Sequence, residues 1–135
     1  MKAWFEIERP ITVEADIPLK DEAPEEIKEK YASTLQGKFI AWSTSNGELI
    51  GCIKNNRSVC ARIEEVKYIE LYEMVPAKGW GELGLAFMAE NGSCVSLIAS
   101  SRHSLESRMW LVMLQEKLVN LFGIPAKYSD LGPDA

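Results

Sequence analysis

The sequence predicts an α+β fold, with one antiparallel, meander-rich sheet of about six or seven strands, an acidic helix in the N-terminal half and an apolar C-terminal helix. Three observations predict it: apolar residues that alternate with polar ones near the N-terminus, two Asn-Gly pairs between strand-forming segments, and a long apolar stretch that ends at a glycine. The 135 residues suit a single domain. We place this domain at 1–125 and expect a loosely held polar tail at 126–135.

The N-terminal third predicts two short strands and then a helix. Residues 4–7 are strand formers, and residues 11–17 alternate between apolar and polar side chains. From Pro24 onward, apolar residues recur every fourth position as far as Leu35, and Gly37 can end a helix. This helix is therefore expected to be amphipathic, with an acidic outer side.

The Asn-Gly pair at 46–47 is a strong signal for a tight hairpin. A two-residue turn fixes the register of the flanking strands and places Trp42 opposite Gly51. A further turn at 55–56 would place Cys60 opposite Gly51 on the next strand. The three strands are therefore expected to form one meander.

The three cysteines are Cys52, Cys60 and Cys94. Their number is odd and they lack the Cys-x-x-Cys spacing of metal sites, so the sequence predicts neither a disulfide framework nor a structural metal. The hairpin register places Cys52 and Cys60 on opposite faces of the sheet. We expect all three to be reduced and mostly buried.

Residues 59–75 fit either a helix or strands, and their β-branched and aromatic residues favour strands. A glycine-rich segment at 76–81 follows, which we interpret as a mobile loop with Trp80 as a possible anchor for a partner. The carboxylates at 64, 65, 70 and 73 are interpreted as a solvated strand edge.

A second Asn-Gly pair, at 91–92, predicts another hairpin. Its register would pair Met88 with Val95 and Leu85 with Ile98. Because both faces of this hairpin are substantially apolar, we expect it to be covered on two sides.

The C-terminal helix is expected from Ser104 to Phe122, with Gly123 and Pro125 ending it. Residues 109–114 are apolar around the whole helix circumference. One sheet cannot bury a helix on every side. Some of this surface is therefore expected to be covered by another part of the fold, by a second copy in a homodimer, or by a partner.

The net charge is −5, and residues 1–36 alone hold nine acidic and five basic residues. An acidic surface attracts cationic partners and repels phosphate backbones, so a basic protein is the expected partner and nucleic acid is not. The expected partner-binding residues are Glu22, Glu25, Glu26, Glu29, Trp80 and Trp110.

His103 is the only histidine, in a junction between an expected strand and the C-terminal helix. We interpret it as an exposed junction residue. The alternative is a small enzyme or ligand-binding domain that uses Arg102, His103 and Cys94. The chain contains no catalytic, phosphate-binding or metal motif, and we expect neither a catalytic residue nor a cofactor.

A further alternative follows from a resemblance. The order of the expected helix, Gly37, the Asn-Gly turn at 46–47, Gly51 and the strands after it resembles Sm-like barrels, which typically bind single-stranded RNA as rings. The acidic and asparagine residues of that family's RNA-contacting loop would fall near Arg57 and Ala61, and neither is present.

The leading expectation is a non-catalytic protein-binding module. It would be an inhibitor or immunity-type protein that neutralises a basic partner, or a small acidic chaperone. The longest apolar run has only the six residues 109–114, far fewer than the roughly 20 needed to span a bilayer. We therefore expect no membrane association and a cytoplasmic location.

Overall fold

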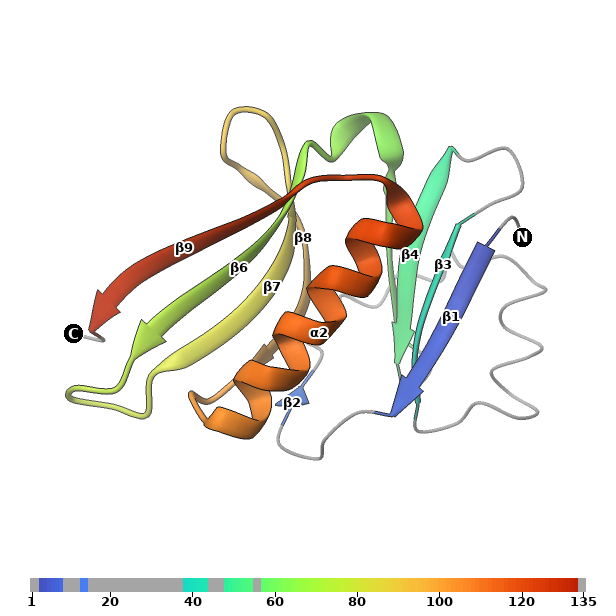
Figure 1. Ribbon diagram of the computed structural model, residues 1–135. Helices are drawn as coiled ribbons and strands as arrows, with labels where there is room; N and C mark the ends of the chain where they lie inside the picture. The colour runs from blue at the N-terminus through green and yellow to red at the C-terminus, as the bar shows by residue number, and fades with distance from the viewer. Residues whose placement is uncertain (1–2, 9–12, 15–37, 44–47, 55–56, 134–135) are drawn as a thin grey trace.

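The fold consists of two sheets that share one long helix (Figure 1). The computed structural model describes residues 3–8, 13–14, 38–43, 48–54 and 57–133. Its strands are β1 (Ala3–Glu8), β2 (Val13–Glu14), β3 (Lys38–Ser43), β4 (Leu49–Lys54), β5 (Arg57–Arg62), β6 (Tyr68–Val75), β7 (Glu82–Met88), β8 (Cys94–Ser101) and β9 (Ala126–Pro133). A short 3-10 turn, η1 (Ile63–Glu65), follows β5, and the helix α2 is Leu105–Phe122.

The strands form two sheets, with the orders β1-β3-β4-β5 and β2-β8-β7-β6-β9. The α+β class is as predicted, but the prediction of a single meander sheet is wrong. The chain passes from the first sheet to the second between β5 and β6, where η1 interrupts the strand-forming segment. Both sheets are open in the described part of the chain, unlike a closed barrel. The acidic helix predicted from Pro24 lies outside the described residues.

The first sheet has the predicted local register. Trp42 pairs with Gly51, and Gly51 pairs with Cys60 on the other side. Side chains alternate across a strand, and Cys52 consequently lies in the core while Cys60 is half-buried. The two-residue turns predicted at 46–47 and 55–56 lie outside the described residues.

The β7–β8 hairpin has the predicted register only at its centre. Its two central pairs are Ala86 with Leu97 and Phe87 with Ser96. Toward the ends, Leu85 pairs with Ala99 and Met88 with Cys94, each one residue away from the prediction. The ladder is irregular at both places, and an extra residue in one strand shifts every pair beyond it.

Residues 126–133, predicted as a loose polar tail, form β9 at the edge of the second sheet. This strand runs parallel to β6, with Tyr128 beside Leu71 and Asp130 beside Glu73. Polar residues can form such an edge strand because backbone hydrogen bonds, rather than a buried face, hold it in place.

The predicted helix bounds are confirmed. The Ser104 hydroxyl caps the first turn by accepting a hydrogen bond from the Ser107 backbone N–H at 3.1 Å. At the other end, Gly123 takes the left-handed conformation, with φ of 69°, and its N–H bonds the Val119 carbonyl. No helix in the described part of the chain is long and apolar enough to cross a membrane.

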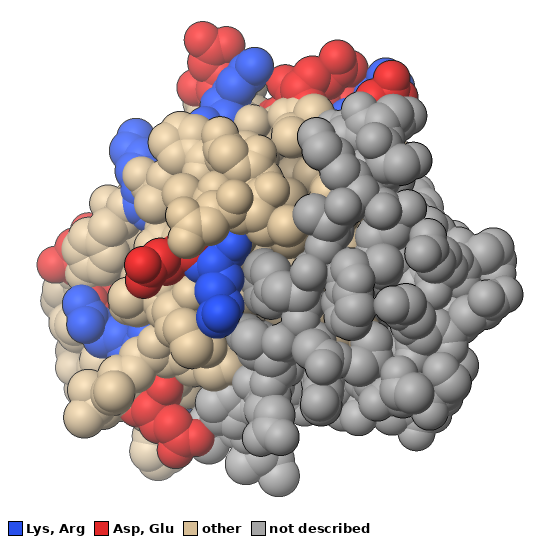
Figure 2. All heavy atoms as spheres, turned by 45° about the vertical axis from the view of Figure 1, so that its right-hand side comes forward, with Lys and Arg blue, Asp and Glu red and all other residues tan. Residues whose placement is uncertain are grey.

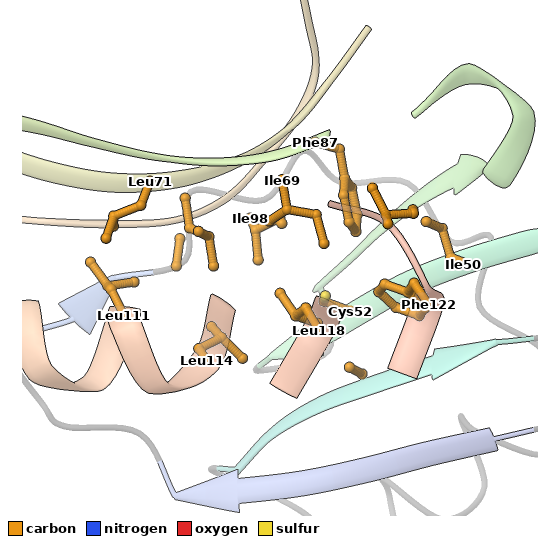
Figure 3. Packing of buried hydrophobic residues seen from close by; sticks show 14 of the residues in the cluster. Ile50, Cys52, Ile69, Leu71, Phe87, Ile98, Leu111, Leu114, Leu118 and Phe122 are labelled. Carbon is orange, nitrogen blue, oxygen red and sulfur yellow. The ribbon is translucent and has the colours of Figure 1, made fainter. Parts of the chain in front are cut away.

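The inner face of α2 packs against both sheets, so one hydrophobic core joins them (Figure 3). Phe39 from the first sheet meets Trp110 of α2 edge to face, with ring centroids 5.7 Å apart. Phe87 from the second sheet meets Phe122, with centroids 6.0 Å apart. Burial of this apolar surface is the main stabilising contribution to the fold.

Candidate functional site

A buried carboxylate lies at the end of an apolar row on β6. Ile69, Leu71 and Glu73 alternate with more exposed residues and share the face that α2 covers. Glu73 is only 8% exposed. A charged group at such a position requires partners, because an unpaired buried charge is strongly unfavourable.

Three elements supply those partners. Glu73 Oε2 lies 2.5 Å from His103 Nε2, at the junction of β8 and α2, and 3.5 Å from Arg108 Nε in the first turns of α2. Glu73 Oε1 accepts a hydrogen bond of 2.6 Å from the Tyr128 hydroxyl on β9. We call Glu73, His103, Arg108 and Tyr128 the Glu73 cluster.

These contacts shift two ionisation equilibria. The hydrogen bond from Tyr128 and then that from His103 lower the pKa of Glu73, with a further contribution from the Arg108 charge. The same Tyr128–Glu73 bond raises the pKa of Tyr128, because ionised Tyr128 could not donate it. The ionised carboxylate and the neutral phenol are therefore the favoured forms.

The loop between β6 and β7 fits closely over the cluster. Gly81 has a φ of 71°, and a Cβ placed on it would lie 2.9 Å from His103 Cβ and 2.5 Å from the Met74 carbonyl oxygen. The neighbouring Trp80 ring lies 5.0 Å from the Arg102 guanidinium, within cation–π distance. Glycine is required at 81 by both its backbone conformation and the close approach of His103.

Exposed apolar side chains come from the same elements that meet at this cluster. The large hydrophobic residues that are exposed in the described part of the chain all come from β6 and its following loop, α2 and β9. They are Val75, Trp80, Leu105, Met109, Val112, Met113, Tyr128 and Leu131. We call this set the apolar surface. The cluster and the apolar surface therefore draw on the same three regions of the chain.

The apolar surface includes one face of α2. Leu105, Met109, Val112 and Met113 follow helical spacing along the solvent side, and we call them the outer stripe. Leu105 and Met109 are 73% and 64% exposed. The fold therefore covers only the inner half of the apolar helix predicted from the sequence. On the face shown in Figure 2, charged side chains of both signs are scattered among uncharged ones over the described residues.

The residues predicted to bind a partner have different environments. Trp80 is 69% exposed and belongs to the apolar surface. Trp110 is only 7% exposed and packs against Phe39, so it is a core residue in the free protein. The acidic group at 22, 25, 26 and 29 lies outside the described residues.

Two sequence interpretations near this site are wrong. The His103 side chain is 22% exposed and bonded to Glu73, so it is not an exposed junction residue. Glu73 itself is not on a solvated edge. Its burial could have been anticipated from period-two alternation, since it falls two residues after Leu71 on the inward row. The partners of Glu73 could not have been anticipated, because they come from segments that are distant in the sequence.

One form of the catalytic alternative needs Cys94 near His103. Cys94 begins β8, whereas His103 follows the last residue of that strand, so their backbones are separated by roughly 25 Å. Cys94 is exposed, contrary to the prediction of burial, and partial desolvation with nearby Glu70 raises the pKa of its thiol. The structure does not bring this pair together.

The described residues contain no group of three or more His, Cys, Asp or Glu side chains that could hold a metal ion. No family model matches the chain, and no curated protein or solved structure is significantly similar to it. The site must therefore be interpreted from its own geometry.

Proposed function

We propose that this chain is a non-catalytic protein-binding module whose interface is the apolar surface around the Glu73 cluster. The observation that carries the proposal is the outer stripe, four exposed apolar side chains on one face of a rigid helix. Contiguous exposed apolar residues on a soluble domain are typical of protein interfaces. Trp80, Tyr128 and Arg108 belong to the residue types that contribute most to binding at such interfaces.

The Glu73 cluster supports a structural role at the centre of this interface. Both carboxylate oxygens are engaged by donors from separate elements. The cluster therefore fixes the start of α2 on β6 through His103 and Arg108. Binding residues held in fixed positions lose less conformational entropy when a partner docks.

The proposed partner is a basic protein, since the whole chain carries a net charge of −5. An inhibitor or immunity-type protein would abolish its partner's activity in the complex. A small acidic chaperone would instead keep its partner soluble without acting on its activity. Assays of partner activity and partner solubility distinguish these two forms of the same proposal.

Photocrosslinking tests the proposal. A photoreactive amino acid is placed at Met109 in the outer stripe, and the matched control carries it at Glu64, whose side chain is 70% exposed on η1. We expect one basic protein to crosslink at 109 and not at 64, and the purified pair to form a complex without crosslinking. Crosslinks at 64 alone, or equally at both positions, would contradict the proposed interface.

A second candidate is a small enzyme, favoured by the 2.5 Å contact between His103 and Glu73. Such a pair can orient a histidine as a general base. Against it, the Ser101 hydroxyl directs its proton to the Ser107 hydroxyl at 2.7 Å and the Arg102 carbonyl at 2.8 Å. The His103→Ala variant distinguishes the two functions: the binding proposal expects partner affinity to change less than about tenfold, whereas an enzyme would lose turnover.

A further inference from the structure

Strand β9 is attached to the fold without contributing to its core. None of its eight residues is buried, and none belongs to the hydrophobic core cluster. Backbone pairing with β6 holds it, together with the Tyr128–Glu73 hydrogen bond and the Gln115 side-chain amide, which donates to the Lys127 carbonyl at 3.0 Å. The Lys127 ammonium also lies 4.9 Å from the Tyr68 ring centroid.

The segment before β9 is held more firmly. Ile124 is buried in the core, and the Pro125 carbonyl accepts a hydrogen bond from the Ile69 N–H at 2.9 Å. The boundary between the core and the weakly held strand therefore falls at residue 126. Segments with few buried apolar contacts open at lower free energy than the whole domain. Opening β9 would leave the core contacts of α2 intact.

We propose that β9 is a releasable strap fastened by the Tyr128–Glu73 hydrogen bond, and that the β6 edge beneath it accepts β9 from a second copy of the chain. Release exposes the unpaired backbone edge of Ile69–Val75, and an exposed edge accepts an added strand. This inference concerns the β6 edge, whereas the outer stripe of α2 carries the proposed function. Tyr128 belongs to both surfaces, and the tests below do not use the outer stripe, so either proposal can fail alone.

A second copy is the occupant that the contacts favour. The edge already fits this sequence, since Tyr128 reaches Glu73 and Lys127 reaches Tyr68 in the observed register. The same strand from another molecule can make each of these contacts unchanged. Exchange of an identical element is a common route to dimers of this kind.

Hydrogen exchange tests whether the strap opens. In the wild type, amides of β9 are expected to exchange faster than those of β7, whose residues are nearly all buried. Tyr128→Phe should increase β9 exchange roughly tenfold, because a hydrogen bond to a charged acceptor is lost. The matched control is Tyr72→Phe, which removes a 2.6 Å bond to Glu82 between β6 and β7 and should not affect β9. Equal exchange of β9 and β7 in the wild type, or no effect of Tyr128→Phe, would overturn the strap.

Binding of a β9 peptide tests whether this strand from a second copy can occupy the β6 edge. A synthetic peptide with the sequence of residues 126–133 is titrated into the full-length wild type and the full-length Tyr128→Phe chain. We expect severalfold tighter binding to the Tyr128→Phe chain, whose own strap is loosened while the peptide still carries the tyrosine. A peptide with phenylalanine at position 128 should bind the Tyr128→Phe chain more weakly than the tyrosine peptide does. Failure of the tyrosine peptide to bind, or equal binding of both peptides, would overturn the proposed occupant.

Discussion

Glu73 determines how three separate regions of the chain meet. Its two oxygens accept hydrogen bonds from Tyr128 and His103, and Arg108 lies beside them. Each of these partners joins β6 to a different segment. The stability of the contacts between β6, α2 and β9 should therefore depend on the ionisation of one carboxyl group.

The first prediction concerns this ionisation. Glu73→Gln should lower the free energy of unfolding by about 1–3 kcal/mol at neutral pH, because it removes the charged acceptor. The pKa of Glu73 is lowered in the folded state, so its contribution is complete above the unfolded value of about 4.3. It is lost as the pH falls through the folded pKa. The difference between wild type and variant should therefore shrink as the pH falls below about 4.

Denaturant unfolding at pH 3–8 measures this dependence. The groups that act on Glu73 are His103, Arg108 and Tyr128, with Asp130 beside it in the strand register. Glu82→Gln is the control, since Glu82 is exposed and also accepts a tyrosine hydroxyl. It should change stability by less than about 0.5 kcal/mol. A pH-independent difference between wild type and Glu73→Gln would contradict the ionised form of the cluster.

The second prediction concerns Gly81. Gly81→Ala should destabilise the protein by about 2–4 kcal/mol, since strain in the left-handed backbone adds to the clash with His103 and Met74. Gly132→Ala is the control, because Gly132 also has a positive φ of 77° but open space around it. Thermal unfolding of both variants separates the two contributions. Equal destabilisation would show that His103 does not require glycine at 81.

At the residue scale, the sequence predicts whether a side chain is buried only where its pattern distinguishes the faces of the strand or helix. The inward position of Glu73 follows from alternation with Leu71. The sequence pattern does not predict whether Trp110 or Met109 is the exposed side chain, because residues 109–114 are apolar on every side. Only the packing of α2 against Phe39 determines which half is buried.

At the element scale, α2 has two apolar faces with different roles. The inner residues Leu111, Leu114 and Leu118 are fully buried, whereas Met109 is 64% exposed. Met109→Lys should therefore change the free energy of unfolding by less than about 0.5 kcal/mol. Leu111→Ala should cost about 2–5 kcal/mol, because it leaves a cavity. If urea unfolding shows that both variants lose a comparable free energy of unfolding, the outer stripe contributes to folding.

The predictability of the strands depends on how local their pairing is. The register of Trp42 with Gly51 could be predicted, because the Asn-Gly pair between the two segments is a local sequence signal. The shifts at Leu85 and Met88 arise from irregularities in the ladder that no composition signals. The pairing of β9 with β6 joins segments more than fifty residues apart, so neither the strand nor the second sheet could be found from local patterns.

At the scale of the whole molecule, the proposed binding mode combines a charged chain with an apolar contact surface. Net charge acts over long range and affects mainly association, whereas apolar contacts affect mainly dissociation. Reversing Glu25, Glu26 and Glu29 to lysine should therefore slow association with a basic partner and weaken its salt dependence. Stopped-flow rates between low and physiological salt measure this. Identical association rates and identical salt dependence for wild type and variant would show that these acidic residues do not contribute to association with the partner.

The most direct test of the protein-binding role is the affinity of the crosslinked partner for three full-length chains. These are the wild type, the Met109→Lys/Met113→Lys variant and Glu64→Lys, which makes the same change in net charge at a 70% exposed position on η1, away from α2. We expect the double variant to bind at least about 30-fold more weakly, which corresponds to about 2 kcal/mol. Glu64→Lys should bind as the wild type does. Unchanged affinity of the double variant, with its fold intact, would contradict the outer stripe as the binding surface.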